Sequence, residues 1–232
     1  MNLVLPPVPE NPVRPPMVDL PGEEPFRIDT VDGHSLEARL RLPSDARRAV
    51  VLCHPHPLYG GTMHNAVIVA VAKTLAQADE PTAVLRFNFR GVERSSGRYS
   101  EGQGEKLDVL AAIDGLRNMN PRMDISVVGY SFGSWVGMRA AWEHPEVERL
   151  ALIAPAARVF SYVEDQECRR PLPTFIAVGD QDGFASVDSV RKLASCLGAH
   201  LDIIHGADHF FVGYRRTLAT RLMPFIAPTM GK

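Results

Sequence analysis

The sequence has few cysteines and no long apolar run. Its three cysteines, Cys53, Cys168 and Cys196, are odd in number and show no CxxC spacing. This pattern excludes a disulfide framework and a cysteine-rich zinc site, and it favours a reducing cytoplasm. No apolar stretch approaches the roughly 18 residues of a membrane helix, and prolines interrupt the amino-terminal segment. We therefore expect neither a membrane span nor a secretion signal.

The chain also lacks an excess of charge of either sign. It has 232 residues, of which 25 are basic and 27 are acidic, for a net charge of −2. Such a surface does not concentrate nucleic acid or anionic lipid, so we expect neither as a partner. Apolar residues make up 45% of the chain, which is enough to build a full core at this length. The composition predicts a soluble globular protein.

Proline is distributed unevenly. Eight of the 19 prolines lie in residues 1–25, where each fixes φ and removes a backbone donor. We interpret this segment as an extended, partly polyproline-II arm that is solvated or lies on the domain surface. The alternative is a docking arm for a partner or a second subunit. The remaining residues, 26–232, are predicted to form a single domain.

From residue 26 onward, short apolar runs alternate with segments of helical length. Residues 26–43 predict two strands joined at Asp32-Gly33, a dipeptide suited to a tight hairpin turn. Six further runs are typical of buried strands, at 48–53, 82–89, 125–130, 149–155, 174–180 and 200–206. Five helices are expected between and after them, at 64–79, 103–119, 132–144, 186–197 and 209–227. This rhythm predicts an α/β fold in which one eight-stranded sheet has parallel crossovers and helices on both faces.

Residues 129–133, GYSFG, carry the strongest chemical signal. They place a G-x-S-x-G pattern between a β-branched strand and a small-residue helix, which is the arrangement of a nucleophile elbow. The glycines permit a turn so sharp that larger side chains would collide with neighbouring backbone. We therefore predict that Ser131 is a nucleophile presented at a helix N-terminus. The plainer alternative is a strand-to-helix turn with a capping serine.

A serine nucleophile needs a base, and the base needs an acid that orients it. The loops after the last two predicted strands supply both, in the chain order serine, acid, histidine. Asp180 and Asp182 follow the seventh strand, and we predict Asp182 as the acid because it lies further into the loop, with Asp180 as a turn residue. We predict His209 as the base, at the start of the last expected helix and behind its N-cap, Asp208. His205 is assigned to the strand end as a packed or hydrogen-bonded histidine.

The oxyanion of a tetrahedral intermediate needs backbone N–H donors. The amide of Phe132, directly after the nucleophile, is predicted as one donor. The loop after the third strand supplies the other. Two prolines in that loop have no N–H, so His56, Leu58 and Tyr59 are the candidates, and we prefer His56.

The same loop raises the question of a metal. His54-x-His56, with His64 nearby, has a spacing that resembles metal ligands. No Asp or Glu lies between residues 53 and 71 to complete such a site, so no metal is predicted. The Gly-Gly-Thr turn at 60–62 lacks the lysine of a phosphate-binding loop. We expect no cofactor.

Together, these motifs resemble the α/β-hydrolase superfamily, and more closely a group of small, lidless, dienelactone-hydrolase-like serine hydrolases. The matching stretches run in order along the chain, at 54–65, 85–97, 104–108, 129–134, 179–182 and 206–211. The resemblance implies a mostly parallel sheet with an antiparallel second strand, Ser131 as nucleophile, Asp182 as acid and His209 as base. Glu93 departs from the group, which usually carries glycine there. Serine also replaces the cysteine of true dienelactone hydrolases, so their substrate is not implied.

We therefore expect a cytoplasmic serine esterase that cleaves small or short-acyl carboxylic esters through an acyl-enzyme. Residues 156–171 form the longest connection without a predicted element, and they are too few for a folded lid, so no cap domain is expected. Five aromatic residues are candidates for the substrate pocket, although each could equally belong to the core: Tyr59, Trp135, Phe160, Phe184 and Phe210. The alternatives are a peptidase or acyltransferase with the same triad, or a non-catalytic binding protein of this fold.

Overall fold

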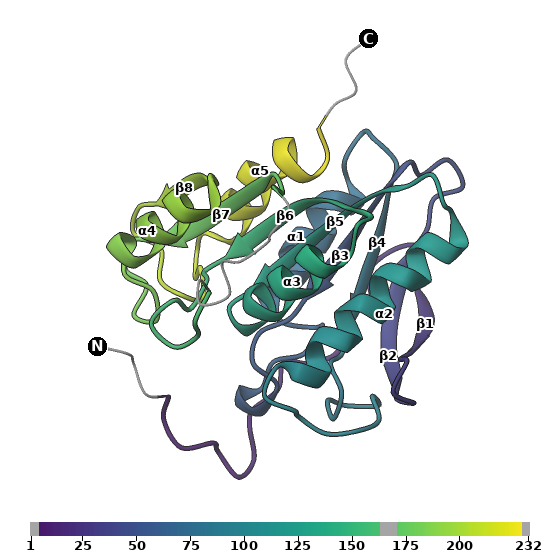
Figure 1. Cartoon of the computed structure of the whole chain (residues 1–232), viewed down its shortest axis with the longest axis horizontal. Helices are drawn as coiled ribbons and strands as arrows, with labels where there is room; N and C mark the ends of the chain where they lie inside the picture. The colour runs from purple at the N-terminus through teal and green to yellow at the C-terminus, as the bar shows by residue number, and fades with distance from the viewer. Residues whose placement is uncertain (1–4, 163–170, 229–232) are drawn as a thin grey trace.

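The computed structural model describes residues 5–162 and 171–228, and within them eight strands form one sheet (Figure 1). The strands are β1 (Glu24–Asp29), β2 (Ser35–Arg41), β3 (Arg48–Cys53), β4 (Thr82–Phe87), β5 (Asp124–Tyr130), β6 (Val147–Ile153), β7 (Thr174–Gly179) and β8 (His200–Ile204). The helices are α1 (Ala66–Ala76), α2 (Gln103–Met119), α3 (Phe132–Glu143), α4 (Val187–Leu197) and α5 (Arg215–Ile226), with a short 3₁₀ helix, η1 (Pro57–Tyr59).

The order of strands in the sheet is β1-β2-β4-β3-β5-β6-β7-β8. The pairs β1–β2 and β2–β4 are antiparallel, and every other neighbouring pair is parallel. Strands β3, β4 and β7 are buried along their whole length, whereas β2 alternates between buried and half-buried residues, as expected for a strand with one wetter face. The predicted eight-stranded, mostly parallel α/β-hydrolase sheet, with its antiparallel second strand, is confirmed.

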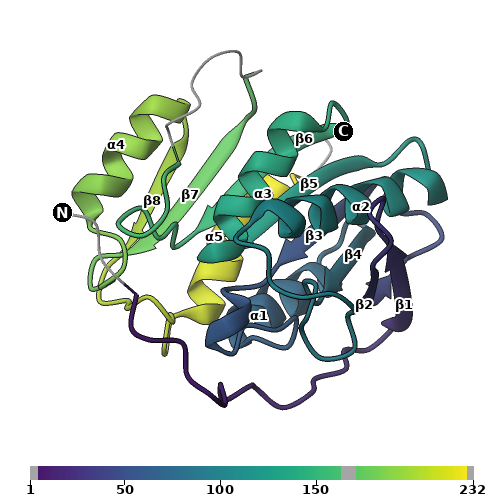
Figure 2. The ribbon, with the colours of Figure 1, turned by 60° about the horizontal axis from the view of Figure 1, so that its bottom comes forward.

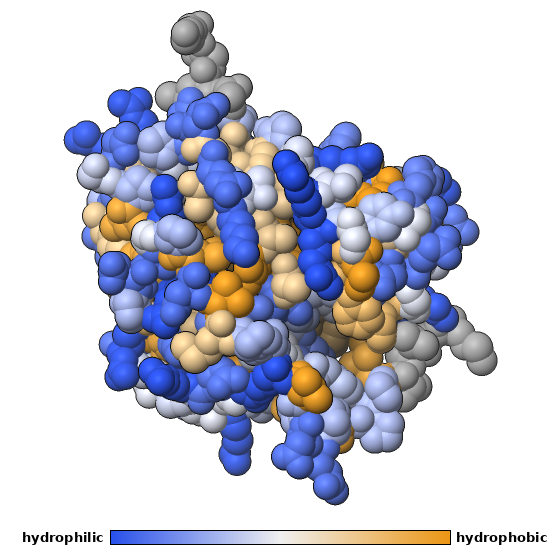
Figure 3. All heavy atoms as spheres, turned by 180° about the vertical axis from the view of Figure 1, so that it is seen from behind, coloured by the Kyte–Doolittle hydropathy of each residue, from blue (hydrophilic) through white to orange (hydrophobic). Residues whose placement is uncertain are grey.

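Helices cover both faces of the sheet, with α2, α3 and α4 on one side and α1 and α5 on the other (Figure 2). Successive strand residues point to opposite faces, so Val51 and Val127 join one core cluster while Val50 and Val128 join the other. Seen from behind, the molecule is mostly hydrophilic, with apolar patches between the polar side chains (Figure 3). Within the described residues, no helix is both long and apolar enough to cross a membrane.

The last helix begins later than the sequence predicts. We expected a helix from residue 209, but α5 starts at Arg215, and residues 205–214 form a loop that contains several turns. Phe211 and Gly213 have φ of 50° and 80°, values that interrupt a right-handed helix. Asp208 caps a turn, because its Oδ1 accepts a hydrogen bond from the Val212 amide at 3.1 Å. His209 therefore lies on a loop and does not open a helix.

Candidate active site

Ser131 lies at the junction of β5 and α3, where the backbone is strained. Its φ of 54° is rare for a residue with a Cβ, and its amide donates to the carbonyl of Ile153 at 2.9 Å. A Cβ on Gly129 would lie 2.2 Å from the carbonyl oxygen of Gly133, and one on Gly133 would lie 2.3 Å from that of Cys53. The glycines of the G-x-S-x-G pattern are therefore required by close backbone approach, as the sequence predicts.

His209 and Asp182 meet at this serine, from the loops after β8 and β7. His209 Nε2 lies 3.0 Å from Ser131 Oγ, and its Nδ1 lies 2.8 Å from Asp182 Oδ2. The tautomer with its proton on Nδ1 satisfies both contacts, because Nδ1 then donates to the carboxylate and Nε2 accepts from the serine hydroxyl. Asp182 is itself fixed, since its Oδ1 accepts from the amides of Phe184 and Ala185 at 2.7 and 3.0 Å. All three side chains are thus held in a row.

The two other candidates form a separate pair. Asp180 Oδ2 lies 2.9 Å from His205 Nδ1, and its Oδ1 accepts from the Gly206 amide at 2.7 Å. The hydrogen bond from His205 lowers the pKa of Asp180. The His205 side chain is 85% exposed, whereas those of His209 and Asp182 are 8% and 0% exposed. The structure therefore brings Asp182 to His209 and leaves Asp180 with His205 at the surface.

The two residues predicted to supply the oxyanion donors, Phe132 and His56, contact each other through their rings. Phe132 is the first residue of α3, where an amide has no carbonyl one helical turn earlier to accept its hydrogen bond. The ring of His56 packs on that of Phe132 with centroids 4.9 Å apart. The amides of Leu58 and Tyr59 are already used, donating to His56 Nδ1 at 3.2 Å and to the His56 carbonyl at 3.1 Å. Burial lowers the pKa of His56 to about 4, so its imidazole is neutral near pH 7.

Two tyrosines that sequence reasoning did not identify, Tyr130 and Tyr162, support the site from behind. The Tyr130 hydroxyl donates to the carbonyl of His209 at 3.0 Å. The Tyr162 hydroxyl lies 2.7 Å from Ser134 Oγ, which donates to the carbonyl of Ser131 at 2.5 Å. Burial raises the pKa of both tyrosines, so each stays protonated and able to donate. These contacts hold the backbone of Ser131 and of His209 in place.

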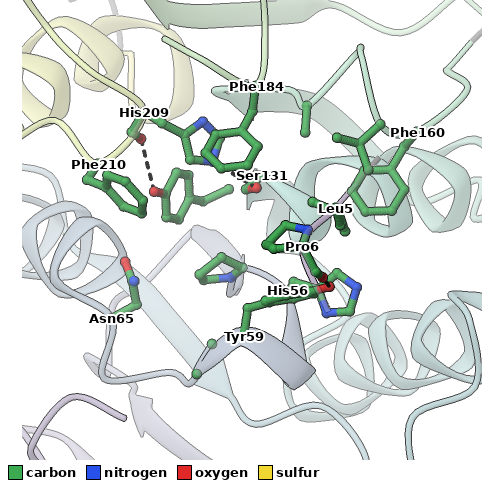
Figure 4. Close-up of a pocket in the computed structure, with 16 residues that line it drawn as sticks. Leu5, Pro6, His56, Tyr59, Asn65, Ser131, Phe160, Phe184, His209 and Phe210 are labelled. Atoms are coloured by element: carbon green, nitrogen blue, oxygen red, sulfur yellow. Dashed lines mark hydrogen bonds between the residues drawn. The ribbon is translucent and has the colours of Figure 1, made fainter. Parts of the chain in front are cut away.

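Ser131 and His209 open into a pocket of about 250 Å³ (Figure 4). Four of the five predicted pocket aromatics line it: Tyr59, Phe160, Phe184 and Phe210. Trp135 does not; it stacks behind Phe160, with centroids 5.0 Å apart, and its Nε1 donates to the Ser161 carbonyl. The sequence missed further lining residues, namely Leu5, Pro6, Pro55, Gly60, Gly61, Asn65, Tyr130, Ala156 and Val159.

The three histidines with metal-like spacing have protein partners instead. His54 is fully buried, with Nδ1 2.6 Å from the Pro55 carbonyl and Nε2 accepting from the Phe89 amide at 3.0 Å. His64 Nδ1 accepts from the Val18 amide at 3.0 Å. Among the described residues, no three potential ligands cluster as a metal would need. The His54 contacts join the loops after β3 and β4, which positions the strand end beside His56.

A doubly covered sheet, with a serine on a strained strand-to-helix turn facing a histidine and a carboxylate, defines an α/β-hydrolase fold. The family described as serine aminopeptidase, S33, matches residues 44–165, which is just over half of the chain. RP471, an uncharacterized protein of Rickettsia prowazekii, is 40% identical over 172 residues, covering 70% of this chain and 71% of that protein. The chain therefore belongs to this family of α/β serine hydrolases.

Solved structures agree with this assignment. An α/β serine hydrolase homologue from Coxiella burnetii is 30% identical, covers 90% of this chain and 100% of its own, and superposes with a TM-score of 0.79. XC6422 from Xanthomonas campestris, described as a serine hydrolase without a lid, is 26% identical, with 93% and 100% coverage and a TM-score of 0.76. We expected the connection at 156–171 to be too short for a lid. Residues 163–170 of this connection lie outside the described residues.

Proposed function

We propose that this hydrolase cleaves carboxylic esters with small acyl groups, using Ser131, His209 and Asp182 as a catalytic triad. The observation that carries the proposal is the unbroken series of contacts from Ser131 Oγ through the two ring nitrogens of His209 to Asp182, at 3.0 and 2.8 Å. Both distances lie within the reach of a proton transfer. The near-complete burial of His209 and Asp182 strengthens the electrostatic contact between them.

The proposed reaction has two halves. Ser131 Oγ bonds to the ester carbonyl carbon while its proton passes to His209 Nε2, and Asp182 stabilises the resulting imidazolium. The carbon–oxygen bond to the alcohol then breaks, and the alcohol leaves with the proton from Nε2. In the second half, water gives a proton to His209 Nε2 and its oxygen attacks the acyl carbon. The bond from that carbon to Ser131 Oγ then breaks, Oγ takes the proton back from Nε2, and the acid leaves.

The amides of Phe132 and His56 are the proposed donors to the oxyanion. The Phe132 amide is unpaired by the helix because it belongs to the first turn. His56 is the remaining candidate of its loop, since the amides of Leu58 and Tyr59 donate within the loop itself. The neutral His56 ring brings no positive charge, so stabilisation would come from backbone dipoles.

The pocket supports an ester substrate over a peptide with a free amino terminus. Its 16 lining residues include no Asp or Glu, so no carboxylate in the described pocket could pair with a protonated α-amine. Placing an unpaired ammonium group in such an apolar site costs several kcal/mol. The family's description as a serine aminopeptidase is therefore a weaker guide to substrate than the lining itself.

Pocket size supports a small acyl group. A cavity of about 250 Å³ exceeds the roughly 150 Å³ that holds a benzene ring, and it falls below the roughly 300–1,000 Å³ of sites for drug-sized ligands. The lining is mainly aromatic and aliphatic, which suits a hydrocarbon chain or an aryl acid. We therefore expect the preferred acyl group to be small or short-chained.

The test is hydrolysis of p-nitrophenyl esters from acetate to octanoate by the wild type, Ser131→Ala and a matched control, Ser44→Ala. Ser44 is exposed and lies outside the pocket. We expect Ser131→Ala to lose a factor on the order of 10⁶ in kcat, as nucleophile knockouts can. Ser44→Ala should match the wild type.

An amino-acid p-nitroanilide tests the peptidase alternative in the same assay. Faster turnover of the anilide than of the esters would overturn the ester proposal while keeping the triad. Equal ester turnover by the wild type and Ser131→Ala would overturn the mechanism. If neither turns over substrate, and a fluorophosphonate does not label Ser131, the chain is a binding protein of this fold.

A further inference from the structure

The proline-rich arm reaches the catalytic pocket. Its described part runs along the molecule from the α4–β8 side, past α1, to β1 (Figure 2). Leu5 and Pro6 line the pocket of Ser131, and the Pro6 carbonyl accepts a hydrogen bond from the Tyr59 hydroxyl at 2.6 Å. The arm therefore supplies part of the pocket wall.

Specific contacts fix the arm along its length. The backbone of the arm at Val13 lies so close to Gly60 that a Cβ on Gly60 would be 2.2 Å from the Val13 carbonyl oxygen. Arg14 Nη1 pairs with Glu93 Oε1 at 3.1 Å. Glu93 thus fixes the middle of the arm to the loop after β4.

Nearer to β1, the arm is bound into the body of the protein. The Val18 amide donates to His64, and the Val18 carbonyl accepts from Arg86. The buried guanidinium of Arg86 also donates through Nε to Glu23 Oε1 at 2.7 Å. Leu20 is 5% exposed and packs in the core cluster beneath α1 and α5. These contacts span 46 to 68 positions of sequence and give the arm one defined path.

The side of the pocket that the arm occupies decides its role. The leaving alcohol must lie within reach of His209, which returns its proton. In Figure 4, Leu5 and Pro6 lie on the same side of Ser131 as Phe160, whereas Phe210 lies on the other side, next to His209. A substrate whose leaving alcohol faces His209 and Phe210 would extend its acyl chain toward the arm.

We propose that Leu5 and Pro6 close the acyl side of the pocket and set the length of acyl chain that it accepts. This inference rests on the proposed function. An aliphatic side chain and a proline ring exclude water and offer only apolar contact, so they select hydrocarbon by size. The hydrogen bond from Tyr59 and the pair of Arg14 with Glu93 hold this wall against the body of the enzyme.

The test compares Leu5→Ala and Leu5→Trp with the wild type, using p-nitrophenyl butyrate and octanoate. Val8→Ala is the matched control, because Val8 lies on the same arm, is 50% exposed and does not line the pocket. We expect Leu5→Ala to raise the ratio of kcat/KM for octanoate over butyrate about tenfold, since one methylene is worth roughly 10–200-fold in an apolar pocket. Leu5→Trp should lower the ratio, and Val8→Ala should keep it.

A second readout separates this inference from the proposed function. The rates at which short- and long-chain alkyl fluorophosphonates label Ser131 report the same pocket without ester turnover. An unchanged chain-length ratio in both Leu5 variants, with turnover still dependent on Ser131, would overturn the inference and keep the esterase. If esters are not cleaved but the labelling ratio moves as expected, the ester proposal fails and the arm's role stands. If Ser131 is neither active nor labelled, both fail.

Discussion

The buried imidazole of His54 should make this protein sensitive to acid. Its Nδ1 faces the Pro55 carbonyl, and its Nε2 accepts from the Phe89 amide, so a second ring proton has no acceptor. Burial lowers the pKa of His54 from 6.5 to about 3. In the unfolded chain the ring becomes protonated below pH 6.5, whereas in the folded protein it stays neutral down to about pH 3. Stability from this group is therefore complete above pH 6.5 and is lost as the pH falls through that window.

The magnitude follows from the two pKa values. At pH 4.5 the unfolded ring is protonated and the folded ring is neutral, and the difference amounts to about two pH units. At 1.36 kcal/mol for each unit, the folded state loses about 2.7 kcal/mol relative to pH 7.5. That is a large share of the roughly 5–15 kcal/mol by which a typical domain is stable.

The assay is urea unfolding at pH 7.5, 5.5 and 4.5, followed by tryptophan fluorescence, for the wild type and His54→Gln. A glutamine carbonyl can accept from the Phe89 amide and does not titrate in this range. Asp108, whose pKa burial raises to about 6, also titrates there, but it is present in both proteins and cancels in the difference. We expect the wild type to lose about 2.7 kcal/mol more than the variant between pH 7.5 and 4.5.

The exposed His205 provides the control, and His205→Asn should keep the steep dependence of the wild type. If the free energy of unfolding falls by the same amount between pH 7.5 and 4.5 in the wild type and in His54→Gln, the reasoning is refuted. That result would mean that the folded protein accommodates a proton on His54, for instance by releasing the Phe89 amide.

Two further predictions concern the proposed triad acid and the turn at Ser131. Asp182→Asn should lower kcat by about 10⁴, because the amide no longer fixes the histidine tautomer, while Asp180→Asn should stay within a few-fold of the wild type; the reverse order in ester kinetics would exchange the two roles. Gly133→Ala should cost about 3 kcal/mol or more in urea unfolding, since its Cβ would lie 2.3 Å from a backbone oxygen at the end of β3. Gly183→Ala meets nothing within 4 Å and should be near neutral, so equal loss in both variants would contradict the steric argument.

The sheet was predictable because each strand has a local pattern of apolar residues in the sequence. Runs such as that of β3 are apolar along their length, and alternation in β2 marks a strand with one wetter face. The elbow was predictable for a similar reason, since two glycines and a serine at fixed spacing permit a backbone that other residues exclude. The choice of Asp182 over Asp180 needed only the order of the loops and the position of Asp182 further into its loop, although its catalytic role stays a prediction.

Features that depend on distant contacts were not predictable. The sequence around His209 offers an N-cap and an apolar pattern, yet the positive φ of Phe211 delays the helix to Arg215. Trp135 follows the elbow closely, but its indole turns toward Phe160 and away from the pocket. The arm shows no periodic pattern, and its path is determined by partners 46 to 79 positions away in the sequence. Its path could therefore not be predicted from its own residues.

Glu93 connects a strained turn after β4 with the proline-rich arm. Its φ of 49° is one that glycine adopts freely, and a residue with a Cβ pays about 1 kcal/mol or more to hold it. The ion pair with Arg14 is 29% and 42% exposed at its two side chains, and pairs so exposed return about 0.2–1 kcal/mol. The pair therefore offsets the backbone strain at best, and glycine would serve the loop alone equally well or better. What glutamate adds is a fixed position for Arg14, and with it the path of the arm toward Pro6 and Leu5 at the catalytic pocket.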